Sequence, residues 1–130
     1  MKSLERYADL ALAILRVVVA VLFLIHGAQK LFGVLDGHRP AVGTQLWFGG
    51  VIELVCGGLV ALGLFTRPAA FLASGTMAVA YVQFHWKLAG GAAFFPVVNK
   101  GELAVVYAVV FLYLACVGAG RYSLDELRRR

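Results

Sequence analysis

Five polar side chains interrupt long apolar stretches of the sequence, and their chemical types suit proton transfer. They are His26, Lys30, Glu53, Gln83 and His85. Ionisable groups in such stretches are costly and usually face a protein interior or a water-filled cavity. A carboxylate and an imidazole can exchange protons, while a lysine and an amide can donate hydrogen bonds. Together these residues predict a site that binds a polar group and protonates it.

Helical periodicity places the cationic residues of the first apolar stretch on one face. At about 100° per residue, Arg16, His26 and Lys30 fall within about 80° of one another. Glu53 is the one charge in the next apolar stretch. Because a lone buried charge is costly, we expect Arg16 and Glu53 to pair, directly or through water.

Four apolar runs must position these residues. The chain has 130 residues, of which 62% are apolar and 15% charged, against about 45–50% and 25% in a soluble domain. A membrane-crossing helix needs about 20 mainly apolar residues. The sequence therefore predicts an all-α membrane protein, with one domain over 1–130 and a four-helix transmembrane bundle. The predicted spans are about 10–31, 46–65, 68–86 and 103–120.

Basic residues orient the predicted bundle. With four spans, both termini and the 66–67 connection share one side, where seven of the basic residues lie. Short loops rich in Lys and Arg remain in the cytoplasm, so we expect both termini there, in a prokaryotic inner membrane. The net charge of +5 indicates this orientation and contact with anionic lipids. No basic stripe points to a nucleic-acid partner.

The polar residues converge at one depth, in the outer half of the bundle. His26 and Glu53 are the predicted proton-exchanging, catalytic pair, because neither reaches water easily. The predicted binding residues are Arg16, Lys30, His85, Gln83, Trp47, Trp86 and Glu102. Phe84 would add to the apolar wall, and the apolar segment 88–98 could cover the site.

Several of these residues also have purely structural explanations. Lys30 and Lys87 could extend to the headgroups, and His85 could be an interfacial residue beside Trp86. Glu102 could cap its helix in a box with Asn99. Arg16 could be only a counter-charge to Glu53.

Capping and small residues support the same boundaries. Thr66 is a plausible N-cap with Pro68 in the first turn, and Ser123 to Glu126 has capping-box spacing. Small residues in the second and third spans predict close helix packing: Gly49, Gly50, Gly57, Gly58, Gly63, Ala69, Ala73 and Gly75.

Cys56 and Cys116 differ in predicted depth by roughly 10 Å, so no disulfide is expected. No metal site is predicted.

The ordered motifs resemble the DoxX family of small four-helix membrane proteins. The matching pieces run from Arg16 through HGAQKLF at 26–32, Glu53, GLFTRPAA at 63–70 and NKGELA at 99–104 to GRYSLD at 120–125. The resemblance implies a membrane protein of redox metabolism. Some members look like subunits of a thiosulfate:quinone oxidoreductase, and others are linked to oxidative-stress assemblies.

Residues and resemblance together favour a redox-associated subunit that binds a quinone-like head group. One alternative is a non-enzymatic anchor or assembly partner for a soluble redox protein, whose polar cluster only holds helices together. Another is a haem protein with His26 and His85 as axial ligands. A small transporter ranks last, because no inverted repeat is visible. A protein partner and a homo-oligomer are both compatible with the sequence.

The predicted orientation can be tested by cysteine labelling. Single cysteines at Asp36 and Gly90 should react with an impermeant reagent added outside, because the 33–45 and 87–101 loops are expected there. Labelling confined to the 66–67 turn would show that the orientation is inverted.

Overall fold

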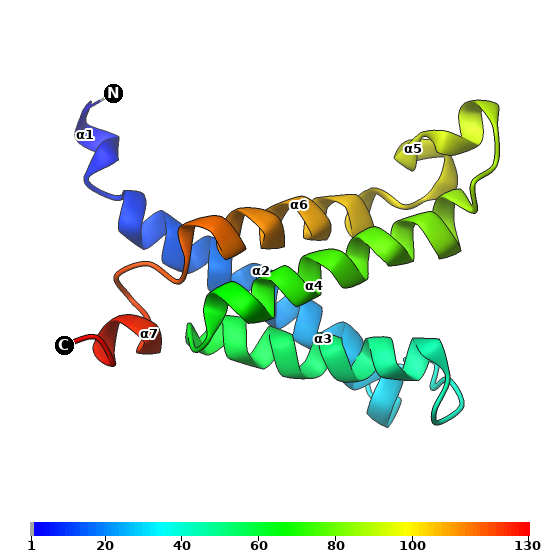
Figure 1. Ribbon diagram of the computed structural model, residues 1–130, viewed down its shortest axis with the longest axis horizontal. Coiled ribbons are helices and arrows are strands. Elements are labelled where there is room, and N and C mark those ends of the chain that lie inside the picture. The colour runs from blue at the N-terminus through cyan, green and yellow to red at the C-terminus, as the bar shows by residue number, and fades with distance from the viewer. Residues whose placement is uncertain (1) are drawn as a thin grey trace.

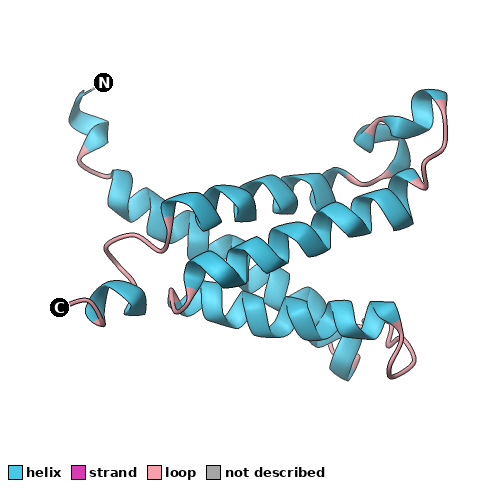
Figure 2. Ribbon diagram, viewed as in Figure 1, coloured by secondary structure: helices cyan, strands magenta, loops and turns pink. Residues whose placement is uncertain are grey.

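The computed structural model describes residues 2–130, and these residues form helices and loops without a strand (Figure 2). The elements are α1 (Lys2–Glu5), α2 (Ala8–Phe32), α3 (Gln45–Leu62), α4 (Thr66–Ala80), the π-helix η1 (Tyr81–Trp86), the 3₁₀-helix η2 (Gly91–Phe94), α5 (Pro96–Asn99), α6 (Glu102–Val117) and α7 (Leu124–Leu127). The predicted all-α class is confirmed.

The four predicted spans coincide with the four longest helical stretches. Helices α2 and α3, with 25 and 18 residues, are long and apolar enough to cross a membrane. Helix α6 is apolar but has 16 residues. Helix α4 continues directly into η1, so that its helical stretch runs from Thr66 to Trp86.

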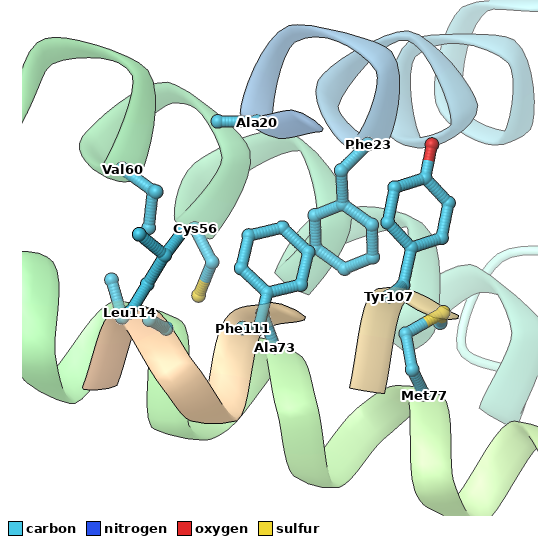
Figure 3. Packing of buried hydrophobic residues seen from close by; sticks show 11 residues of the cluster. Ala20, Phe23, Cys56, Val60, Ala73, Met77, Tyr107, Phe111 and Leu114 are labelled. Atoms are coloured by element: carbon cyan, nitrogen blue, oxygen red, sulfur yellow. The ribbon is translucent and has the colours of Figure 1, made fainter. Parts of the chain in front are cut away.

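The long helices associate as two pairs (Figure 1). Helix α2 packs along α3 and α4 packs along α6, whereas α3 and α4 contact each other less extensively. Phe23 of α2 joins the pairs, because its ring centroid lies 4.7 Å from that of Phe111 and 5.4 Å from that of Tyr107 on α6. Figure 3 shows these rings beside Met77 and Cys56. This aromatic cluster is the centre of the core.

Glycines bring the backbones of α2 and α3 into contact. A Cβ atom on Gly27 would lie 2.4 Å from the Leu54 nitrogen, and one on Gly57 would lie 2.8 Å from the Leu24 nitrogen. The predicted packing role is therefore confirmed for Gly57. Gly49 and Gly75, in contrast, border open space.

Arg16 lies at the end of the bundle that carries both chain termini, and the predicted Arg16–Glu53 pair is wrong. Its buried guanidinium donates to the carbonyls of Val60 and Ala61, at 2.7 and 2.6 Å. It also donates to the carbonyls of Ala119 and Tyr122, at 3.1 and 2.7 Å. Backbone carbonyls at a helix C-terminus carry partial negative charge, so they satisfy this cation without a carboxylate.

The same end is closed by Asp125, which caps α4. Its carboxylate accepts hydrogen bonds from the backbone N–H groups of Phe65 and Thr66, at 2.8 and 2.9 Å. The predicted N-cap, Thr66, is therefore wrong: Thr66 is the first residue of α4, and the N-cap is Phe65. Ser123 does cap α7, since its hydroxyl accepts from the Glu126 N–H. A carboxylate at a helix N-terminus is favourable because of the helix dipole.

At the opposite end, Asn99 fastens the connection between η1 and α6. Its side chain donates to the Tyr81 hydroxyl at 3.1 Å and to the Ala93 carbonyl at 2.9 Å, and accepts from the Gly101 N–H. The predicted Asn99–Glu102 capping box is therefore wrong, because Gly101 and not Asn99 is the N-cap of α6. Helix α6 begins after Gly101 without a side-chain cap.

Replacement of Arg16 should destabilise the protein strongly. Hydrogen bonds to charged groups contribute about 1.5–3 kcal/mol each, so Arg16→Met is expected to cost about 3 kcal/mol or more. Arg67, which is exposed but also donates to the α6 carbonyls of Ala115 and Val117, provides the matched control. Thermal unfolding in detergent should show a larger loss for Arg16→Met than for Arg67→Met. Equal losses would contradict a central role of Arg16.

The Asp125 cap should depend on pH. Burial alone would raise the pKa of Asp125, but the N–H groups of Thr66 and Phe65 and the charge of Arg128 hold that pKa below its usual value. A carboxylate with a lowered folded-state pKa stabilises above its unfolded pKa of about 3.9, and the stabilisation disappears as pH falls through the folded pKa. Asp125→Asn should therefore lower Tm near pH 7, and the difference from wild type should shrink below pH ~4. Asp36→Asn, in an exposed loop, should show no such dependence.

Candidate functional site

A cavity of about 690 Å³ lies at the end of the bundle remote from the chain termini, between the two helix pairs. The polar residues that line it are His26, Lys30, Gln45, Glu53, Thr76, His85, Lys100 and Tyr107. They come from α2, α3, α4, η1, α6 and the loop before α6. Sequence stretches that are far apart therefore contribute to one site.

The Lys30–Glu53 ion pair forms the charged wall of the cavity. The Lys30 ammonium lies 2.5 Å from Glu53 Oε1, and Glu53 is 2% exposed. The second carboxylate oxygen, Oε2, is buried and has no hydrogen-bond partner among the described residues. Carboxylate oxygens in such surroundings normally find a donor. Glu53 thus offers one free acceptor, or one protonation site, at the cavity.

His26 and Tyr107 form the next part of the lining. The His26 ring meets the Tyr107 ring edge to face, with 6.1 Å between the centroids. Tyr107 is 4% exposed, and no hydrogen bond joins its hydroxyl to another residue in 2–130. His26 and Glu53 line the same cavity. A carboxylate, an imidazole and a phenol are therefore gathered in one place, and each can carry a proton.

His85 and Lys100 complete the polar lining from the other helix pair. His85 lies in η1, and its Nδ1 is 3.3 Å from the Asn99 carbonyl oxygen. That contact orients the imidazole ring through Nδ1 and does not involve the other ring nitrogen, Nε2. π-Helical turns are rare and frequently occur at functional sites. The predicted convergence of His26, Lys30, Glu53 and His85 matches this arrangement.

The other predicted site residues do not line the cavity. Arg16 is at the opposite end of the bundle, and Glu102 is exposed at the start of α6. Trp47 packs against Phe48, and Trp86 packs against Phe94. Gln83 hydrogen-bonds to Gln45, and so joins η1 to the start of α3 at the edge of the cavity.

Sequence reasoning missed four of the polar lining residues, namely Gln45, Thr76, Lys100 and Tyr107. Tyr107 carried a usable signal, because a tyrosine in an otherwise aliphatic helix needs a partner or a cavity for its hydroxyl. Gln45 and Lys100 lie just outside the apolar runs. Nothing in their local sequence distinguishes them from ordinary loop residues.

Apolar side chains form the remaining walls and open the cavity sideways. Phe48 of α3 and Phe71, Leu72 and Val79 of α4 all line the cavity and are 47–68% exposed. Phe23 and Tyr107, on the α2 and α6 side, are buried and close it from behind. In Figure 1, α3 and α4 meet at the turn that joins them and separate toward their far ends. The opening therefore lies between α3 and α4, on an apolar surface.

The thiols and metal-binding side chains do not add to this site. Both cysteines are free, with Cys56 buried and Cys116 exposed. In the part of the chain that the structure describes, no three His, Cys, Asp or Glu side chains are close enough together to hold a metal ion. The polar side chains that line the cavity can form hydrogen bonds, carry charge and transfer protons.

Comparison with known proteins places the chain in a family. A family model described as DoxX matches residues 11–86. The chain is 47% identical to an uncharacterized protein of Haemophilus influenzae, over 97% of this chain and 96% of that protein. It is 33% identical to the inner membrane protein YphA of Escherichia coli, over 88% of each. No solved structure matches it.

A third relative extends the comparison beyond these bacteria. The uncharacterized membrane protein Rv3486 of Mycobacterium tuberculosis is 30% identical, over 86% of this chain and 77% of that protein. Two of the three relatives are named as membrane proteins, which agrees with the long apolar helices α2 and α3 and confirms the predicted location. Since the family model covers more than half of the chain and the relatives align over most of it, this chain belongs to the DoxX family of membrane proteins.

Proposed function

We propose that the chain crosses the membrane four times and binds a quinone-like head group in the outer half of the bundle, as a redox-associated subunit. Four crossings are supported by the continuous helix from Thr66 to Trp86 and by the apolar sequence of α6. Many large apolar side chains on the outside of the helices are exposed, as a lipid-facing surface requires. Both termini would then be cytoplasmic, because the end of the bundle that carries them has more basic residues than the other end.

The free Oε2 atom of Glu53 is the observation that carries this proposal. A buried carboxylate with one oxygen paired to Lys30 and the other without a partner is arranged to accept from a bound group or to hold a proton. If Glu53 served only to join α2 and α3, both oxygens would be expected to have donors. The cavity beside it provides space for a ligand.

The shape and polarity of the cavity suit a lipid-soluble ring. Ligand pockets have volumes of about 300–1,000 Å³, mostly apolar walls and a few polar groups that fix orientation. Here Gly49 and Gly75 leave open space, and Phe48, Phe71 and Phe84 line the cavity. An opening between α3 and α4 faces the bilayer, so an isoprenoid tail could remain in lipid while the ring enters.

Five of the polar lining residues would have a role toward such a ring. A bound quinone supplies two carbonyl oxygens that take up protons when it is reduced. Lys30 and the Tyr107 hydroxyl would donate hydrogen bonds to a carbonyl, while Glu53 and His26 would hold and transfer protons at Oε2 and the imidazole nitrogens. Lys100 adds positive charge at the rim. Electrons would come from a partner redox protein.

Two alternatives make different use of the same residues. In an anchor or assembly partner for a soluble redox protein, the Lys30–Glu53 pair would only join α2 to α3, and a partner helix would fill the opening. In a haem protein, His26 and His85 would be axial ligands, which is compatible with their lining one cavity. Purified protein with a Soret band would establish the haem alternative.

Quinone binding should depend on the cavity residues. Glu53→Gln and His26→Ala should each weaken binding of a ubiquinone or menaquinone analogue by about tenfold or more, because a hydrogen bond to a charged group contributes about 1.5–3 kcal/mol. The two tryptophans, Trp47 and Trp86, are next in sequence to the lining residues Phe48 and His85, so quenching of their fluorescence by the quinone gives the measurement. Protein in nanodiscs of fixed lipid composition should be used for all variants.

Matched controls separate loss of binding from loss of fold. Glu102→Gln and His38→Ala change the same residue types at exposed positions outside the cavity, and should bind as wild type does. Thermal unfolding should show that Glu53→Gln and His26→Ala remain folded. If both cavity variants bind the quinone like the controls, the assembly-partner function replaces this one.

A further inference from the structure

A second cavity, of about 650 Å³, lies at the opposite end of the bundle and is lined by five arginines. It is bounded by the start of α4, the end of α6 and the C-terminal segment that contains α7. The arginines are Arg67, Arg121, Arg128, Arg129 and Arg130, and the acidic lining residues are Asp125 and Glu126. The cavity lining therefore has an excess of three positive charges.

The two acidic groups are already engaged by the protein. Asp125 caps α4 through the N–H groups of Phe65 and Thr66. Glu126 Oε1 lies 3.9 Å from Nε of Arg130. Both carboxylates therefore already have partners within the protein.

Some of the arginines also have partners, and the remainder do not. Arg67 donates to carbonyls at the end of α6, and Arg128 lies 4.8 Å over the Phe65 ring. Arg121 and Arg129 are exposed, and within residues 2–130 neither guanidinium has a carboxylate within ion-pairing distance or a side-chain hydrogen bond. Two guanidinium groups at this cavity thus remain free to bind an anion.

The surroundings of the cavity resemble a membrane surface more than an aqueous cleft. Next to the basic residues, Tyr122, Leu124 and Leu127 expose apolar side chains, at 55%, 38% and 64%. Leu124 and Leu127 are three residues apart on α7 and so share one face of that helix. Apolar side chains next to arginines are typical of segments that lie in the headgroup layer. Figure 1 places α7 beside the ends of the long helices.

We propose that this cavity binds the phosphate of an anionic membrane lipid, with Arg121 and Arg129 as its principal ligands. Guanidinium groups bind phosphate oxygens through paired N–H donors. Basic pockets between membrane helices on the cytoplasmic side are known to hold such headgroups. The exposed leucines of α7 would contact the acyl chains of the same lipid. This site is independent of the quinone-binding cavity and stands if that proposal fails.

Lipid-dependent stability tests the site. Detergent-purified protein should gain thermal stability on addition of phosphatidylglycerol and not of phosphatidylcholine. In Arg121→Gln/Arg129→Gln, the gain should fall to less than half of that in wild type. The control Arg39→Gln/Lys87→Gln removes the same charge at the other end of the bundle and should retain the full gain. The gain in wild type should also decrease at high salt.

Two results would overturn the proposal. The first is an equal stability gain in both double variants, which would show that phosphatidylglycerol acts elsewhere or through net charge alone. The second is a gain of the same size with inorganic phosphate at the same phosphate concentration, which would assign the arginines to a soluble phosphate compound. Stability in phosphatidylcholine should be unchanged by Arg121→Gln/Arg129→Gln, because these side chains have no protein partner to lose.

Discussion

The buried guanidinium of Arg16 holds together the end of the bundle on which the rest of the structure depends. It projects from α2, donates to the last carbonyls of α3 and donates again to the chain beyond α6 at Ala119 and Tyr122. One side chain therefore links three segments that are far apart in sequence. A guanidinium suits this position because it has five donors in a fixed plane. At this end α2, α3 and the chain beyond α6 are held together, whereas α3 and α4 separate toward the other end (Figure 1).

Charges at the two ends of the protein serve different purposes. At the closed end, Arg16, Arg67 and Asp125 bind backbone groups at helix termini, where the helix dipole favours the sign of each. At the open end, Lys30 and Glu53 bind each other and leave one carboxylate oxygen without a partner. The first group of charges is fully accounted for by the fold. The second is not, because the Glu53 Oε2 atom has no partner among the described residues.

The sequence predicted the four helices and the core of the site, but not the partners of every charge. Hydropathy located the helices because each spans a long apolar run, and depth along each helix brought together His26, Lys30, Glu53 and His85. The predicted depth of Arg16 in the membrane led to the wrong partner. We expected a carboxylate, but the guanidinium binds backbone carbonyls at the end of α3 and beyond α6. Trp47 and Trp86 were expected in the cavity from their depth, yet their rotation about the helix turns them elsewhere. Rotation depends on how helices pack, which a single sequence does not specify.

The two helix pairs are attached to each other more firmly at one end than at the other, so the width of the cavity entrance depends on the angle between α3 and α4. The pairs are tied at the turn after α3 by Arg16 and Asp125, while across the opening Gln45 and Gln83 provide a single amide contact. Helix α3 has 18 residues, so at about 1.5 Å per residue it acts as a lever about 27 Å long. A rotation of about 5° at the tied end displaces the far end by about 2 Å over that length. Small angular changes at the tied end thus become changes in the width of the entrance between α3 and α4.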